Sequence, residues 1–355
     1  MSRLGRVLVA ALVLAGWTTA SWAADVIEVR GEAAKINGTI TDVSKEKVTI
    51  KTTKDEVKEI PAGQIVDISW EGEPTALKQG RSHEAGGRLP QALEAYTKAA
   101  ADNKSDKAGV KADIEYFAIR TEVRIASNDP SKINDALKKL NEFVSKNGSS
   151  RHFYEASGYV VELNLTKKDA AGAKAAAEAL AKSSGNEQKM AAKIALGRVA
   201  LMENQVPDAQ KLFDEVVAMP TMGTAEESRK QEARLGLAQC LYADKKYDEA
   251  VKLLDDVIEK SAPEDARVQA EAYVRQGDCY QAAKKSKDAL LAYLHVDVLF
   301  ANQKFVHPEA LYHLSQLWTA VQQPDRANEA IDKLNSEYPN SPWTQKLKAT
   351  PAAGS

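Results

Sequence analysis

The sequence predicts a mainly α protein, an α-solenoid of about seven helix pairs preceded by a small five-stranded β-barrel. Residues 25–73 are rich in Val, Ile and Thr and are punctuated by glycine. Residues 74–347 are rich in Ala, Leu, Lys, Glu and Gln, with apolar residues three and four positions apart. In this second region an alanine that opens the second helix of a pair recurs every 34 to 44 residues. The seven alanines are Ala92, Ala136, Ala170, Ala209, Ala250, Ala289 and Ala327. A tail, residues 348–355, is expected to be disordered.

Residues 1–23 have the pattern of a cleavable secretory signal peptide. Two arginines precede an apolar run from Val7 to Ala15, and we expect cleavage after Ala23. The run is shorter than the roughly 20 residues that span a bilayer. An uncleaved N-terminal anchor is the alternative, since Trp17 and Trp22 are bulky for a cleavage region. No cysteine adjoins the expected cleavage site, so the sequence predicts a periplasmic or secreted protein that is not a lipoprotein and has no integral membrane span after cleavage.

Five short strands are predicted after the signal peptide, and closure into a small barrel would remove their exposed edges. Their ranges are Val26–Arg30, Lys35–Val43, Lys47–Thr52, Glu56–Ile60 and Ile65–Trp70. Trp70 is expected to lie in the barrel core, because it alternates with Ile68. The segments GTI at 38–40, VTI at 48–50 and IPAGQIVDI at 60–68 resemble the Sm-like and SH3-like small barrels. Sm-like barrels can bind RNA, but this chain carries 48 basic and 50 acidic residues without a basic cluster, so we expect no nucleic-acid partner.

Small and aromatic residues recur at fixed offsets around the helical alanines. One set is Gly80, Gly87, Ala92, Tyr96 and Ala99; another is Tyr273, Gly277, Tyr280, Ala289 and Tyr293; the last is Leu314, Trp318, Ala327, Ile331, Leu334 and Pro339. These offsets resemble those of the tetratricopeptide repeat (TPR) family over roughly residues 75–345. The resemblance implies that small residues let the helices of a pair approach closely and that the pairs stack into a right-handed superhelix. Most units exceed the family's length of about 34 residues, so related repeats with longer units stay an alternative.

The sequence holds no pattern that catalysis, a cofactor or a metal would require. The five histidines are dispersed and none forms an i, i+4 pair on one helix; they are His83, His152, His295, His307 and His313. Cys240 and Cys279 fall at equivalent positions of adjacent pairs, and helices packed roughly 8–10 Å apart place such positions beyond disulfide reach. We therefore predict two free, buried thiols, no cofactor, no metal and no enzymatic activity.

The TPR resemblance also implies where a partner would bind, because the first helix of each pair lines a concave groove. The groove positions carried over by register are Tyr159, Glu162, Arg198, Leu201, Gln239, Tyr242, Asp278, Gln281, Tyr312 and Gln316. A surface of tyrosine, glutamine and a few charges suits a protein or peptide partner. The first hypothesis is therefore a non-enzymatic protein–protein interaction scaffold or adaptor of the bacterial cell envelope. The alternative is an envelope carrier or enzyme accessory protein that binds a glycan or a small molecule through the β-barrel.

Overall fold

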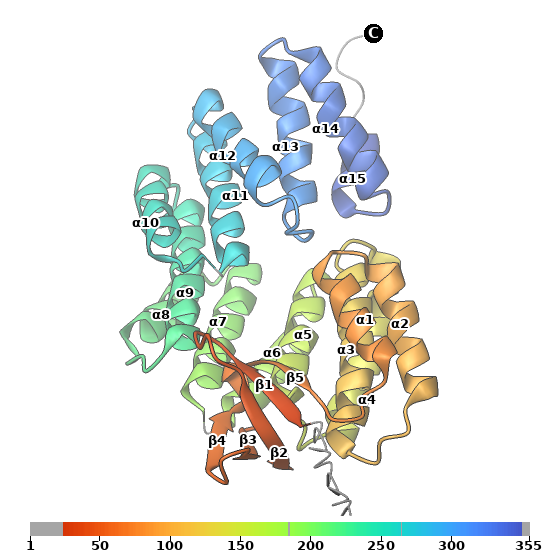
Figure 1. The fold of residues 1–355 in the computed structure, drawn as a ribbon. Coiled ribbons are helices and arrows are strands. Elements are labelled where there is room, and N and C mark those ends of the chain that lie inside the picture. The colour runs from red at the N-terminus through yellow and green to blue at the C-terminus, as the bar shows by residue number, and fades with distance from the viewer. Residues whose placement is uncertain (1–23, 184, 264, 350–355) are drawn as a thin grey trace, which may run out of the picture.

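The protein folds into a curved array of helix pairs, and a five-stranded sheet packs beside the helices of its N-terminal half (Figure 1). The computed structural model describes residues 24–183, 185–263 and 265–349. The predicted signal peptide lies outside this range, as do residues 350–355 of the predicted tail, whereas Lys348 and Ala349 belong to the last helix. Within the described residues, no helix is both long and apolar enough to cross a bilayer. The predicted mainly α solenoid preceded by a five-stranded β-unit is confirmed.

Seven helix pairs stack side by side, and one further helix covers the end of the last pair. The strands are β1 (Asp25–Val29), β2 (Ile36–Val43), β3 (Lys47–Thr52), β4 (Val57–Pro61) and β5 (Ile65–Ser69), with the 3-10 turn η1 (Ala62–Gln64) between the last two. The helices are α1 (Thr75–Ala85), α2 (Leu89–Asp102), α3 (Ala108–Ala126), α4 (Ile133–Lys146), α5 (Phe153–Thr166), α6 (Ala170–Ala181), α7 (Asn186–Met202), α8 (Val206–Ala218), α9 (Thr224–Ala243), α10 (Tyr247–Lys260), α11 (Ala266–Ala282), α12 (Ser286–Leu299), α13 (His307–Ala320), α14 (Pro324–Glu337) and α15 (Pro342–Ala349). The odd-numbered helices α1 to α13 are the first helices of the seven pairs.

The five predicted strands form one antiparallel sheet in the order β4-β3-β2-β1-β5. Its edge strands, β4 and β5, are not hydrogen-bonded to each other, so the described pairing is that of an open sheet and does not show the predicted barrel closure. A helix covers the β5 edge instead. Arg81 of α1 donates a hydrogen bond to the carbonyl oxygen of Ile68 (3.2 Å) and pairs with Asp67 (3.3 Å). A sheet edge that is covered in this way does not need a further strand as partner.

The apolar face of the sheet is continuous with the core of the first helices. Ile27 of β1 and Leu77 of α1 are fully buried in the same cluster. Trp70 is 5% exposed, its Nε1 donates a hydrogen bond to Asp113 of α3 (2.9 Å), and its ring fills the space where a Cβ on Gly109 would lie. The prediction that Trp70 is a core residue is confirmed, and this core is shared between sheet and solenoid. The sheet is therefore built into the first helix pairs.

A residue with a left-handed backbone follows the first helix in six of the seven pairs. These residues, with φ between 59° and 70°, are Gly87, Lys168, Asn204, Lys245, Lys284 and Gln322. Each lies five positions before a buried alanine of the second helix. In the third pair this rule gives Ala173, which is fully buried, whereas the predicted Ala170 is partly exposed. The prediction was wrong by three residues there because the alanine-rich run 170–181 has no unique register.

Glycines at the close helix crossings face aromatic rings. A Cβ added to Gly80 would overlap the ring of Tyr96, and one added to Gly277 would overlap the ring of Tyr293. Both tyrosines are fully buried. The predicted role of small residues in helix approach is confirmed, because the ring of one helix occupies the volume that the other helix leaves free.

Cys240 and Cys279 are free and buried, as predicted. Burial raises the pKa of Cys240 to about 11 and that of Cys279 to about 12. Since the thiolate is the reactive form, we expect neither thiol of the native protein to react with Ellman's reagent at pH 8. Both should react within minutes after denaturation in urea. A denatured, unreduced sample without free thiol would contradict the structure.

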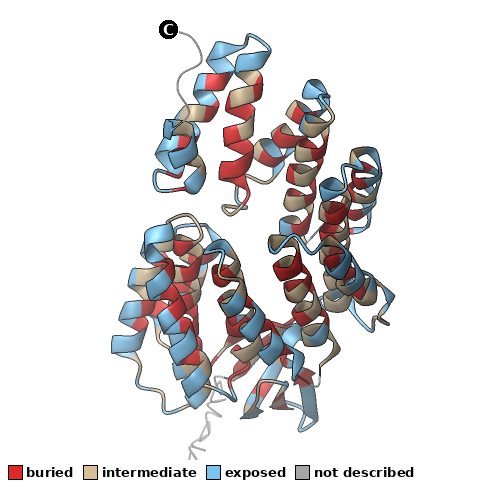
Figure 2. Ribbon diagram, turned by 180° about the vertical axis from the view of Figure 1, so that it is seen from behind, coloured by how far each residue is buried: buried red, intermediate tan, exposed pale blue. Residues whose placement is uncertain are grey.

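The array curves until segments far apart in the sequence meet. Asn340, between α14 and α15, donates a hydrogen bond to Asp129, between α3 and α4 (3.1 Å). Arg267 at the start of α11 forms an ion pair with Glu162 of α5. Buried residues follow the helix faces that meet their neighbours, and exposed residues follow the outside (Figure 2). The first helices α3, α5, α7, α9, α11 and α13 thus surround a common surface, here called the inner face.

Candidate functional site

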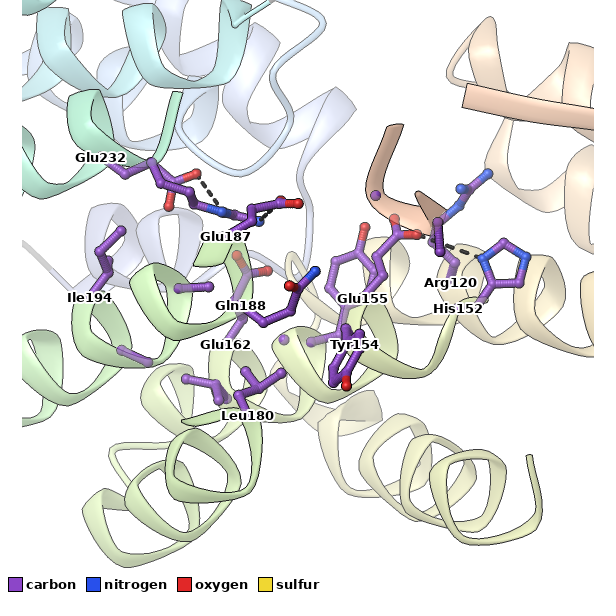
Figure 3. A pocket seen from close by; sticks show the side chains of 18 of the residues that line it. Arg120, His152, Tyr154, Glu155, Glu162, Leu180, Glu187, Gln188, Ile194 and Glu232 are labelled. Carbon is purple, nitrogen blue, oxygen red and sulfur yellow. Dashed lines mark hydrogen bonds and ion pairs between the residues drawn. The ribbon is translucent and has the colours of Figure 1, made fainter. Parts of the chain in front are cut away.

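A cleft opens on the inner face where the sheet meets the helices (Figure 3). It measures about 420 Å³ and is walled by η1, β5 and the turns after β1 and β2, and by helices α3, α5, α7, α9 and α11. We call it the junction cleft. Its charged lining residues are seven basic and four acidic side chains: Arg30, Lys45, Arg120, Arg151, Arg198, Arg229, Arg267, Glu155, Glu162, Glu187 and Glu232.

Helical periodicity brings these residues to one surface. On α5, Glu155, Gly158 and Glu162 are three and four positions apart, and on α7 Ile194 and Arg198 are four apart. Residues at these spacings share one face of a helix. Both helices are the first of their pairs, so that face is the inner face.

Three of the four acids already pair with arginines inside the cleft. Glu162 of α5 pairs with Arg267 across the inner face. Arg229 of α9 pairs with Glu232 (2.8 Å) and with Glu187 at the start of α7 (3.3 Å). Burial would raise the pKa of Glu232, but the charges of Arg229, Arg198 and Arg267 together outweigh it and lower that pKa. The side of the cleft formed by α7, α9 and α11 therefore carries arginine–glutamate pairs that are charged at neutral pH.

On the side formed by α3 and the start of α5, two arginines of the cleft bond to buried carboxylates behind them. Arg151 donates two hydrogen bonds to Asp113 (3.2 and 3.0 Å), and His152 Nε2 donates a third (2.9 Å). Arg120 of α3 donates two hydrogen bonds to the buried Glu84 of α1 (2.8 Å each). Each of these arginines lines the cleft while its charge is balanced from behind.

Glu155 is the fourth acid of the cleft. The Nδ1 atom of His152 lies 3.8 Å from its carboxylate, and the ring of Tyr116 stacks on His152 with 3.9 Å between centroids. Desolvation would raise the pKa of Glu155, but His152 and the charge of Arg120 together lower it to about 2. Glu155 is therefore ionised across the physiological range and is not poised to act as a general acid near neutral pH.

Of the ten predicted groove residues, the structure places Tyr159, Glu162 and Arg198 in the junction cleft. The register of the left-handed residues makes Glu162, rather than Tyr159, the equivalent of Arg198 in its pair. Elsewhere on the first helices lie the other seven, Leu201, Gln239, Tyr242, Asp278, Gln281, Tyr312 and Gln316. Tyr312 is 8% exposed beneath Trp343 of α15, with ring centroids 5.3 Å apart, so it offers little surface to a partner.

A second charged group lies further along the inner face, on α11 and α13. Donor atoms of Asp278, Glu309 and His313 fall within 4.8 Å of one another. Arg275 donates hydrogen bonds to Asp278 (2.5 Å) and to both oxygens of Glu309 (3.2 and 2.9 Å), and Tyr293 donates to Asp278 (2.8 Å). Burial lowers the pKa of His313 to about 4. One arginine, Arg275, thus bridges the two carboxylates. The sequence did not predict this grouping, because its residues come from two different helices and His313 has no histidine partner at helical spacing.

The arginines at positions 229 and 267 are the main residues that sequence reasoning missed. Both precede the groove positions of their own repeat, so the family register gave no signal for them. A charge pattern alone could not have found them, because lysine or arginine also occurs on most of the other helices. They reach the cleft because the array curves.

Two segments, residues 194–266 and 309–341, match family profiles described as tetratricopeptide repeat. Among solved structures, the chain is similar to a tetratricopeptide repeat protein from Parabacteroides merdae, with 16% identity, 77% of this chain and 96% of that chain covered, and a TM-score of 0.47. It is also similar to a Rap protein complexed with competence and sporulation factor (14% identity, 77% and 78% covered, TM-score 0.49). A third similar structure is that of Pseudomonas aeruginosa PilF (13% identity, 78% and 96% covered, TM-score 0.33). No curated protein matches the chain significantly.

The protein is therefore a TPR-like solenoid preceded by a five-stranded antiparallel sheet. TPR folds are typical of protein–protein interaction scaffolds, which bind protein or peptide partners. In this chain the first helices surround the inner face, and the junction cleft lies where that face meets the sheet.

Proposed function

We propose that this protein is a non-enzymatic interaction scaffold of the bacterial cell envelope that holds a protein or peptide partner against its inner face. The junction cleft carries the proposal. Arginine, tyrosine and apolar side chains from the sheet and from separate helix pairs converge there on one concave surface. Arginine and tyrosine contribute strongly to binding when they line such recessed surfaces.

The arrangement of charges in the cleft supports binding rather than catalysis. Three of the acids are held by arginines, and the pKa of Glu155 is lowered to about 2. A nucleophile, a base and an oxyanion donor would have to converge for acyl or phosphoryl transfer. The described lining residues of the cleft do not form such a set.

Export is part of the same proposal and is supported by the N-terminal sequence pattern alone. A basic start, a short apolar run and small residues before Ala24 are typical of a segment that is removed on secretion. The scaffold would then meet its partner in the periplasm or outside the cell.

The alternative, a glycan or small-molecule carrier that binds through the β-unit, would be favoured by a deep pocket around Trp70. That ring is 5% exposed and packs against Gly109, and its Nε1 is bonded to Asp113. A sugar could not stack on it without separating the sheet from α3. Trp70 therefore gives the alternative no support.

Site-specific photo-crosslinking in intact cells tests the proposal. A photoreactive phenylalanine analogue at Tyr159 or Tyr242 should capture the same exported protein, because both positions lie on first helices of the array. The matched control is the analogue at Val298 of α12, a second helix, where the side chain is 71% exposed. Equal capture from Val298, or no exported protein captured from either inner position, would reject the scaffold function.

A further inference from the structure

Three of the four acids of the junction cleft are held by arginines. Glu162 is held by Arg267, and Glu187 and Glu232 share Arg229. These three carboxylates face the two guanidinium groups of Arg267 and Arg229, so the fixed pairs leave this part of the wall with one negative charge.

Two arginines of the cleft, by contrast, have no fixed acidic partner. Arg30, in the turn after β1, and Arg198, on α7, form no side-chain hydrogen bond and no close ion pair with any described residue, although the charge of Arg198 helps to lower the pKa of Glu232. Arg30 is exposed and Arg198 is half-buried. They reach the cleft from its two sides, the sheet and the solenoid. A guanidinium group in this state is suited to a carboxylate, which it can bind through two parallel hydrogen bonds.

At Gly158 the α5 backbone lines the cleft without a side chain. This residue lies inside α5, where glycine is less favourable than alanine. A Cβ on Gly158 would meet no heavy atom within 4 Å. The other helix-interior glycines of the described chain all face a side chain; they are Gly80, Gly109, Gly172, Gly197, Gly236 and Gly277. Packing therefore explains those six, whereas Gly158 leaves free space in the cleft, so a bound chain can approach the α5 backbone closely.

Apolar side chains complete the lining. Ile65 and Val66 of β5 lie on the sheet side, and Leu165 and Ile194 lie on the helix side. A small inorganic anion would leave these groups without contacts. A peptide with carboxylate and apolar side chains would use both the free arginines and the apolar wall.

We propose that the junction cleft binds an acidic peptide segment of the partner, with its carboxylates on Arg30 and Arg198 and its backbone against Gly158. This inference rests on the proposed scaffold function and specifies the chemistry of the partner. The segment is extended and combines aspartate or glutamate with aliphatic residues.

Fluorescence anisotropy with the purified full chain tests the inference. The probe is a labelled eight-residue peptide of glutamate and leucine, and its reference replaces each glutamate by glutamine. The acidic probe should bind about tenfold more tightly at low salt, and the difference should shrink as salt rises. R30Q/R198Q should remove the preference, whereas K54Q/K252Q, which changes two exposed lysines outside the cleft, should keep it.

The Gly158→Ala variant distinguishes a loss of binding from a loss of stability. Alanine fits the free space and favours the helix, so the melting temperature should stay the same or rise while affinity for the acidic probe falls about fivefold or more. Equal binding of the two peptides, or unchanged binding by R30Q/R198Q, would overturn the inference. Full displacement of the probe by millimolar inorganic phosphate would also overturn it, since it would indicate a site for small anions. If the inner face still crosslinks an exported partner in cells, the scaffold proposal stands without this inference; if it does not, both fail.

Discussion

Replacing Asp113 by alanine should lower the free energy of unfolding by about 3–5 kcal/mol, the usual result of breaking a buried ion pair on one side. Asp113 is 1% exposed and accepts hydrogen bonds from Arg151, His152 and Trp70. Truncation would leave a buried guanidinium without its counter-charge and would break the bond that joins the sheet to α3. Urea denaturation followed by circular dichroism measures the effect.

The contribution of Asp113 should also depend on pH. Burial alone would raise its pKa, but Arg151 and His152 hold that pKa well below its usual value. A carboxyl group with a lower pKa in the folded state binds fewer protons there than in the unfolded chain. Its stabilisation is therefore fully present above about pH 4 and is lost as the pH falls through the folded-state pKa. The stability difference between the wild type and Asp113→Ala should be smaller at pH 3 than at pH 6.

Asp248→Ala is the matched control for this prediction. Asp248 also pairs with a basic residue, Lys285 (2.8 Å), but its side chain is 80% exposed. Its removal should leave the urea midpoint unchanged, because water replaces the lost partner. Equal effects of the two substitutions would show that the Asp113 network does not hold the sheet to the solenoid.

Replacing Phe213 by alanine should cost about 3–5 kcal/mol, the range for large aromatic residues in a core. Phe213 of α8 is fully buried, and its ring lies where Cβ atoms on both Gly197 of α7 and Gly236 of α9 would have to be. One ring thus fills the contact between two successive helix pairs. Leu291→Ala on α12 is the control, since Leu291 is 56% exposed and its truncation should change stability by less than about 0.5 kcal/mol.

A double-mutant cycle tests whether the Phe213 ring packs directly against Gly236. Gly236→Ala alone should cost about 1–3 kcal/mol, because the new methyl group overlaps the Phe213 ring. In the Phe213→Ala background the same change should cost little or even stabilise α9, since the ring is gone and alanine favours helix. Additive effects would contradict the close crossing between the ring and Gly236.

Contacts within a repeat could be predicted from the sequence because both partners lie close together along the chain. Gly80 and Tyr96 belong to one helix pair, and so do Gly277 and Tyr293, and the structure brings each pair into contact. The free thiols of Cys240 and Cys279 followed from the same repeat spacing. The register of the third pair could not be predicted in this way, because alanine-rich α6 permits several registers and Ala173 could not be distinguished from Ala170.

The strands of the β-unit could be predicted from their composition, but whether they close into a barrel could not. Whether a five-stranded sheet closes depends on what covers its edges, and Arg81 of a helix that follows the sheet covers β5. Likewise, the three cleft residues that the repeat register identified, Tyr159, Glu162 and Arg198, were found without the arginines that surround them.

The sequence alone therefore determined the repeating helix pairs and their small-to-aromatic contacts, since each depends on residues within one unit or its neighbour. The tertiary structure decided the junction cleft. Its lining residues come from Arg30 to Arg267, and they meet because small rotations between successive pairs add up until α11 faces α5. No local sequence pattern specifies the total rotation, so the cleft can be identified only in the structure in which all the pairs are stacked.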